Sequence, residues 1–171
     1  MRKPKKLINR KYLKEIGINE NHWPETLYTS DHSFIRDHRE KEYLKHYKKV
    51  GVNPAETWNL CTTAMMWLYE RLIEYRNYAS EMVDLEMHRF KIDGKEFTQK
   101  EILDLLIKMA ECILCEPENI KKGSAIWKRL EQNPYIEHCF KLSNCENSDY
   151  IDALEKRFWK IWAVVFPAMW W

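Results

Sequence analysis

Apolar side chains recur every three or four residues along the stretch from residue 54 to residue 79. The repeating positions are Trp58, Cys61, Met65, Leu68, Leu72 and Tyr75. This spacing places one apolar seam along an α-helix, because the helix turns once in about 3.6 residues. Asn53 and Pro54 suit the cap and the first position of a helix, and Glu56 can complete a capping box. The pattern therefore predicts a long helix over residues 54–79 with one buried seam.

The rest of the chain predicts shorter helices separated by breaks. The expected helices cover residues 5–16, 33–49, 99–115, 124–132 and 148–166. Thr98 and Glu101 form a capping box before the third of these, and Ser148 is the expected N-cap of the last. The Asp93–Gly94 pair separates two short apolar runs, which is typical of a two-residue hairpin turn. Residues 89–98 are therefore expected to form a β-hairpin.

Composition supports the helical interpretation. The chain has 171 residues, of which 45% are hydrophobic, so one domain can bury a core. It has only 4 glycines and 6 prolines, whereas a sandwich or barrel needs many turn residues. We expect an all-α fold, a single-domain helical bundle of about five to six helices with one short β-hairpin at about 89–98. The domain spans 1–171, with a basic N-terminal arm (1–17) and a tryptophan-rich C-terminal tail (158–171).

The net charge of +2 is unevenly distributed, because the N-terminal segment is strongly basic. Seven basic residues and no acidic residue occur up to Lys14, which leaves 21 basic against 26 acidic residues in the rest of the chain. Such an arm could contact nucleic acid or an acidic partner. The candidate residues for nucleic acid are Lys5, Lys6, Arg10, Lys11 and Lys14. We favour the alternative, the solvated face of an amphipathic helix, because an apolar stripe runs beneath the charges.

The sequence also indicates the cellular compartment of the protein and its capacity to bind metal. No stretch is long and apolar enough to span a bilayer, and the start resembles no secretory leader, so we expect no membrane contact. Five cysteines in such a chain indicate reduced thiols in a cytoplasm. Cys112 and Cys115 form a CxxC pair, and with Cys139 and Cys145 they could hold zinc. We favour buried free thiols and no metal, because the CxxC lies inside an amphipathic helix.

Sequence motifs of catalysis are missing from the chain, which has no glycine-rich phosphate loop, no GxSxG and no HExxH. Glu70 and Glu74 lie one helical turn apart, as an acid–base pair could. Arg71 and Arg76 are close enough to pair with them at the helix surface, which is the interpretation that we favour. We therefore expect a protein that is not an enzyme, with no catalytic residues and no cofactor.

Most of the eight tryptophans can be explained as core residues. Trp67 differs, because it falls on a second stripe of the 54–79 helix with Arg71, Glu74 and Tyr78. This combination is typical of binding hot spots and of base-stacking sites. The alternative, which we favour, is a second packed face of a central helix. The candidate residues for a ligand or partner are Trp58, Trp67, Arg71, Glu74, Tyr78, Trp170 and Trp171.

The same helix resembles a known motif. Trp58-Asn59-Leu60, followed after ten residues by Arg71-Leu72 and then by Tyr75, matches W-[DN]-L-x(10)-R-L-x-x-[FY]. The motif is similar to one in a family of small helical proteins encoded by bacteriophages. The segment EILDLLIKMAECI of this chain also resembles a downstream helix of that family. Cys61 stands where that family has an aspartate, so a role of this carboxylate does not carry over. The resemblance implies a phage protein that acts in the infected host cytoplasm or in the virion, and it implies no reaction.

These observations lead to one expected function and two alternatives. We expect a non-enzymatic phage accessory protein that binds a host protein or a small aromatic, nucleotide-like ligand in the infected cell. In the first alternative, the protein is a structural or auxiliary virion component that docks onto virion subunits through its basic arm and tryptophan-rich terminus. In the second, which we favour least, it binds nucleic acid through the arm. Each of the three is compatible with a homo-oligomer.

Overall fold

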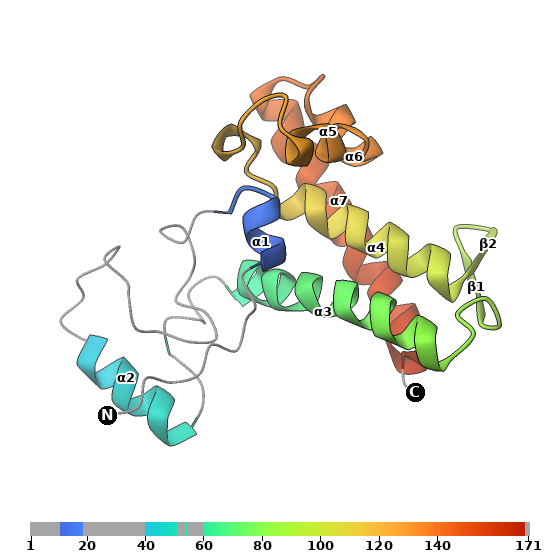
Figure 1. Ribbon diagram of the computed structural model, residues 1–171, viewed down its shortest axis with the longest axis horizontal. Coiled ribbons are helices and arrows are strands. Elements are labelled where there is room, and N and C mark those ends of the chain that lie inside the picture. The colour runs from blue at the N-terminus through green and yellow to red at the C-terminus, as the bar shows by residue number, and fades with distance from the viewer. Residues whose placement is uncertain (1–10, 19–39, 51–53, 55–59, 170–171) are drawn as a thin grey trace.

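The fold is a set of helices with one small hairpin (Figure 1). The computed structural model describes residues 11–18, 40–50, 54 and 60–169. Its elements are α1 (Lys11–Glu15), α2 (Glu40–Val50), α3 (Leu60–Met82), β1 (Arg89–Ile92), β2 (Lys95–Thr98), α4 (Gln99–Leu114), η3 (Pro117–Asn119), α5 (Ala125–Glu131), α6 (Pro134–Cys139), α7 (Asn144–Val165) and η4 (Phe166–Ala168). The predicted all-α fold with one short hairpin is confirmed.

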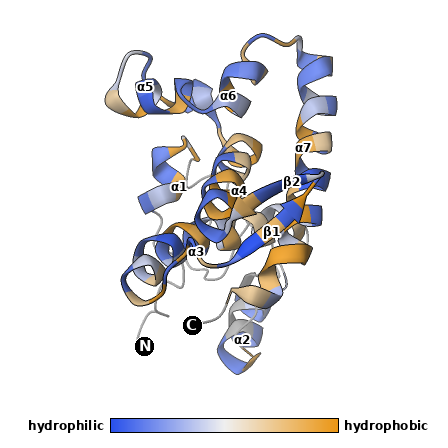
Figure 2. Ribbon diagram, turned by 90° about the vertical axis from the view of Figure 1, so that its right-hand side faces the viewer, coloured by the Kyte–Doolittle hydropathy of each residue, from blue (hydrophilic) through white to orange (hydrophobic). Residues whose placement is uncertain are grey.

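Helix α4 forms the centre of the fold, because α3 packs along one side of it and α7 along another (Figure 1). Its innermost residues, all 0% exposed, are Ile102, Leu103, Leu106 and Met109. The buried residues of α7 are Leu154, Phe158, Ile161 and Val165. Figure 2 shows that the first turns of α7 are hydrophilic and that hydrophobic positions begin further along the helix. Each buried large apolar side chain contributes about 1.5–3 kcal/mol, so this three-helix layer supplies much of the stabilisation.

The predicted seam of α3 is confirmed over most of its described length. Its fully buried members, which are 1%, 6% and 2% exposed, are Met65, Leu68 and Leu72. Tyr75 is half-buried, whereas Cys61, near the start of the helix, is exposed. Trp58 lies outside the described residues. The spacing of three and four residues therefore identifies the side of α3 that faces the core.

The hairpin forms where the sequence predicts it. Ile92 of β1 is paired with Lys95 of β2 in an antiparallel register. Asp93 and Gly94 between them have φ angles of 49° and 79°. Two consecutive residues with positive φ are the requirement of a type I′ turn, whose twist suits the two strands that it joins. The Asp-Gly pair therefore fixes the length and the register of the hairpin.

The predicted cap of α4 is confirmed. The Glu101 amide donates to Thr98 Oγ1 (3.2 Å), and the Thr98 amide donates to Glu101 Oε2 (2.8 Å). This reciprocal pair satisfies two amide groups that the helix start would otherwise leave unbonded.

α3 continues to Met82, beyond its predicted end at residue 79. The predicted helices over 5–16 and 33–49 are described only in part, as α1 and α2.

The prediction that Ser148 caps the last helix is wrong. α7 starts one turn earlier, where the amide and the hydroxyl of Ser143 both donate to Glu146 Oε2, at 2.9 and 2.6 Å. The sequence contains this Ser-x-x-Glu pattern, so the correct start could have been found from the capping-box rule.

The structure has seven α-helices in its described part rather than five to six, because α6 follows Asn133 as a separate short helix.

A carboxylate is buried within the apolar core. Glu111 on α4 is 4% exposed and accepts hydrogen bonds from the Tyr69 hydroxyl (3.2 Å) and the Asn133 side-chain amide (3.0 Å). It also forms an ion pair with Arg129 of α5. A buried charge is costly unless it is paired and hydrogen-bonded, so these partners are required for its burial.

Gly17 attaches α1 to the chain that follows α4. It has a φ of 84°, and a Cβ atom there would overlap the carbonyl oxygen of Glu116. The Glu116 amide donates to the Ile16 carbonyl (2.9 Å), and the Asn119 side-chain amide donates to the Gly17 carbonyl (3.0 Å). Only glycine combines the left-handed backbone with such a close approach. The predicted end of the first helix at Gly17 is confirmed.

We expect Glu111→Ala to lower the free energy of unfolding by about 3 kcal/mol, because the buried side chains of Tyr69 and Asn133 lose their acceptor and Arg129 loses its ion-pair partner. Asp104→Ala is the matched control on the same helix. It removes the ion pair with Arg76 (2.7 Å), whose two side chains are 38% and 39% exposed. This loss should stay below about 1 kcal/mol. Urea unfolding measures both values, and similar losses would contradict the special role of Glu111.

We expect Gly17→Ala to be more destabilising than Gly123→Ala. Both glycines have positive φ, at 84° and 78°, but a Cβ at Gly123 meets no atom within 4 Å. Gly123→Ala should therefore cost only the left-handed backbone strain of about 1–2 kcal/mol. Gly17→Ala adds the clash with the Glu116 carbonyl and should cost at least about 1 kcal/mol more. Equal losses in urea unfolding would show that α1 does not depend on this contact.

Candidate functional site

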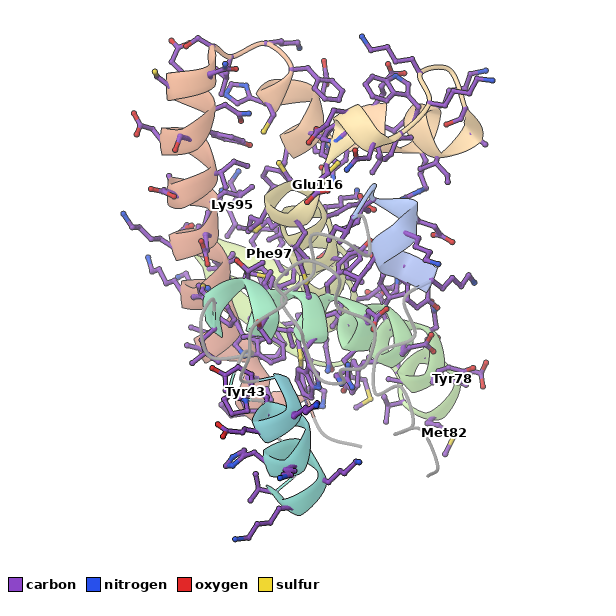
Figure 3. All side chains as sticks on the ribbon, turned by 90° about the vertical axis from the view of Figure 1, so that its left-hand side faces the viewer. Tyr43, Tyr78, Met82, Lys95, Phe97 and Glu116 are labelled. Atoms are coloured by element: carbon purple, nitrogen blue, oxygen red, sulfur yellow. The ribbon has the colours of Figure 1, made fainter. Side chains whose placement is uncertain are left out.

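The second stripe of α3 lies at the surface of the molecule. Leu60, Trp67, Tyr78 and Met82 are 62%, 42%, 58% and 69% exposed. Their spacing places them on one side of the helix, together with Arg71, and this set is termed the outer face of α3. Figure 3 shows Tyr78 and Met82 near the C-terminal end of the helix. The packed-face interpretation of the predicted stripe is wrong for Trp67 and Tyr78, which are exposed.

Trp67 and Arg71 form a stacked pair in the middle of the outer face. The Arg71 guanidinium carbon lies 4.1 Å from the centre of the Trp67 ring, and Arg71 Nη1 donates to the Trp67 carbonyl (3.0 Å). A cation over an indole ring is stabilised by the quadrupole of the ring. Partial burial lowers the pKa of Arg71, and the nearby Glu70 opposes this shift. The pair therefore presents a charged group and a large ring in a fixed arrangement.

Glu74 belongs to the contact between α3 and α1 rather than to an open site. The Tyr12 hydroxyl donates to Glu74 Oε1 (2.6 Å), and this hydrogen bond is the main reason that the pKa of Tyr12 rises to about 12. Arg76 pairs with Asp104 of α4 at 2.7 Å, and Glu70 is buried at 4% exposure. The expected pairing of these charges along the surface of α3 is therefore wrong for Glu74 and Arg76, which bind other helices.

The structure places only part of the other candidate residues. Those outside the described residues are Lys5, Lys6, Arg10, Trp58, Trp170 and Trp171. Lys11 and Lys14 are exposed on α1, while Leu13 and Ile16 beneath them are 0% exposed. The amphipathic interpretation of the basic arm is thus confirmed for its described part.

The remaining described tryptophans differ from Trp67. Trp127, Trp159 and Trp162 are half-buried. The Trp159 ring contacts the fully buried Phe158 edge-on, with 5.2 Å between ring centres. Trp159 Nε1 also donates to Glu155 (3.3 Å). Such aromatic contacts between neighbouring rings are typical of packing, so Trp67 is the described tryptophan that is most available to a partner.

Three of the four cysteines that are candidate zinc ligands lie at one cavity, whereas Cys145 is exposed. Cys112 of α4 lies 3.4 Å from Cys139 of α6, measured between sulfur atoms, and both line a cavity of about 340 Å³ with Cys115. Burial raises the pKa of Cys115 to about 12 and also raises the pKa of Cys112 and Cys139. Burial thus disfavours the thiolate form, which is the form that acts as a nucleophile.

Within the described residues, no group of three or more His, Cys, Asp or Glu side chains has an arrangement that could hold a metal ion. Two further hollows are bordered by described residues, one between the hairpin and α7 and one at the start of α7. Neither these nor the cysteine cavity includes a residue of the outer face of α3. The outer face is therefore a helix surface rather than the wall of one of these three hollows.

Sequence reasoning missed the buried Glu111 network. It joins residues that are distant in the chain, so no local spacing marks it. None of the described helices is long and apolar enough to cross a membrane. Comparisons of the chain with protein-family models, with curated proteins and with solved structures give no match.

Proposed function

We propose that this protein is a non-enzymatic binding protein that docks onto a partner protein through the outer face of α3. The observation that carries the proposal is the exposure of Trp67 and Tyr78 on one side of a helix whose other side is anchored in the core. Tryptophan, tyrosine and arginine are the residues most enriched in binding hot spots. Here Arg71 stacks on Trp67, and the two rings flank it along the helix.

The extent of this surface suits a protein partner. From Leu60 to Met82 the helix rises about 1.5 Å per residue, so the outer face extends over about 33 Å. Its exposed side chains are mostly aromatic or aliphatic, as in the centre of a protein interface. A small molecule would instead need a concave pocket that covers most of its surface. A partner with an apolar groove would complement this face.

α3 is also rigid enough to bind with a low entropic cost. Its inner side packs against α4, and the hydrogen bond from Tyr12 to Glu74 fastens α1 beside the outer face. Side chains that are held on a fixed helix lose less conformational freedom on association than those on a mobile loop. The stacked Trp67 and Arg71 are therefore already arranged for contact.

The phage setting of the proposal comes from the sequence motif of Trp58 to Tyr75. In that setting the partner is a host protein in the infected bacterial cell. The virion alternative depends on the basic arm and on Trp170 and Trp171, which lie mainly outside the described residues. Docking through the outer face of α3 is therefore a more specific proposal than the virion alternative, because its residues can be substituted and tested directly.

We expect Trp67→Ala and Arg71→Ala to weaken partner binding by about 30-fold or more, because truncation of a hot-spot residue costs about 2 kcal/mol or more. The free energy of unfolding should fall by less than about 1 kcal/mol, because the side chains are exposed or half-buried. Partners are captured in bacterial cells with a photoreactive benzoylphenylalanine in place of Tyr78. Mass spectrometry then identifies the cross-linked protein, and its affinity for each variant is measured by titration.

Phe140 provides the matched control, because it is 44% exposed and lies at the end of α6, away from the outer face. Phe140→Ala should leave binding unchanged, and a photoreactive group at position 140 should give no specific cross-link. Two results would contradict the proposal. One is the same cross-links at positions 78 and 140. The other is a loss of about 3 kcal/mol or more in the stability of Trp67→Ala, which would identify Trp67 as a core residue.

A further inference from the structure

A basic hollow lies between the hairpin turn and α7, on residues that the proposed function does not use. It has a volume of about 410 Å³ and is termed the basic groove. Its lining residues are Lys91, Ile92, Asp93, Lys156, Arg157, Lys160, Ile161 and Val164. Figure 2 shows the hairpin strands beside α7. The groove therefore joins the hairpin to α7, two elements that are distant in the chain.

The charges of the basic groove are not balanced. Among the described residues that line it, Asp93 is the one carboxylate, and it lies 3.5 Å from Arg157 and 3.5 Å from Lys160. Lys91 and Lys156 form no ion pair with any described residue. Four cationic side chains thus face one anionic group. Cations gathered in this way repel one another, and a bound anion would relieve the repulsion.

The walls of the groove are held in place by the fold. Asp93 occupies the type I′ turn, whose two positive φ angles leave the loop little freedom. Lys156, Lys160 and Val164 follow one another at intervals of four residues, so they line one side of α7. The cationic residues of the groove are therefore attached to a tight turn and a helix rather than to a long loop.

The floor of the groove is apolar. Ile161 and Ile92 are 1% and 7% exposed, whereas Val164 is 53% exposed at the edge. A purely ionic ligand would gain nothing from these side chains. A ligand that carries an anionic group and an apolar body would contact both the lysines and the floor, as is typical of small-molecule sites.

We propose that the basic groove binds a small phosphate monoester with an apolar body. The phosphate would accept hydrogen bonds from Lys91, Lys156 and Lys160, and the body would cover Val164 and the edge of Ile161. Phosphate fits better than a carboxylate, because its two negative charges and three free oxygens match several separate ammonium groups. A nucleotide and a lipid headgroup both have this chemistry.

An extended polyanion fits the groove less well. Single-stranded nucleic acid is typically bound along a basic track with aromatic side chains for its bases, and none of the described residues that line this hollow is aromatic. The volume of about 410 Å³ lies near the lower end of the range for small-molecule pockets. A compact ligand is therefore the better match.

Isothermal titration calorimetry at low ionic strength tests the proposal with the full chain. The probes are adenosine 5′-monophosphate, a soluble short-chain phosphatidic acid, inorganic phosphate and a short oligothymidylate. We expect one of the two esters to bind saturably and more tightly than inorganic phosphate. Tight binding of the nucleotide would identify the nucleotide source, and tight binding of the phosphatidic acid would identify the lipid source.

Variants connect the binding to the groove. The double substitution Lys156→Gln with Lys160→Gln should weaken ester binding about tenfold or more, because two charged hydrogen bonds are lost. The matched control, Lys121→Gln with Lys128→Gln, changes two exposed lysines near α5 and should have no effect. Val164→Ser should weaken binding of the ester but not of inorganic phosphate. Trp67→Ala should leave all of these affinities unchanged, which keeps the test separate from that of the proposed function.

Three results would overturn the proposal. The first is no saturable binding of either ester. The second is equal affinity for the ester and for inorganic phosphate, because the apolar floor then has no role. The third is much tighter binding of the oligothymidylate with a steep dependence on salt, which would assign the groove to nucleic acid. Circular dichroism of each variant confirms that a loss of binding is not a loss of folding.

Discussion

Glu111 places a carboxylate inside the core, and the groups that compensate its charge come from different parts of the chain. Tyr69 belongs to α3, Arg129 to α5, and Asn133 is the N-cap residue of α6. Because a buried charge without partners costs several kcal/mol, these helices must meet at one point around α4. Apolar contacts alone tolerate small shifts between helices, whereas this hydrogen-bonded centre specifies one arrangement.

α3 connects this centre to the surface. Its inner side supplies Tyr69 and the apolar seam to the core, and its outer face presents Trp67, Arg71 and Tyr78. The same helix therefore stabilises the fold and positions the proposed docking residues. α7 has a similar double role, because Ile161 packs in the core while Lys156 borders the basic groove. In both helices the buried side gives rigidity, which lowers the entropic cost of binding on the exposed side.

Local patterns predicted the elements well and the contacts between them poorly. The Thr98 capping box and the Asp93–Gly94 turn depend on residues within one turn of each other, and both were found from the sequence. The predicted cap at Ser148 places the start of α7 too late, because Ser143 and Glu146 form a capping box earlier in the chain. This capping box is a local pattern, so the correct start is also encoded in the neighbouring residues.

The sequence by itself determined the helical class, the hairpin and the core-facing seam of α3, because periodicity and capping act between neighbouring residues. Only the tertiary structure decided that Trp67 and Tyr78 are exposed, because the number of helices that pack on α3 is not encoded in its own spacing. It also decided the partners of Glu111 and the presence of Lys91 and Lys156 at one hollow. These contacts join residues far apart in the chain, and only the packing of α3, α4 and α7 brings them together.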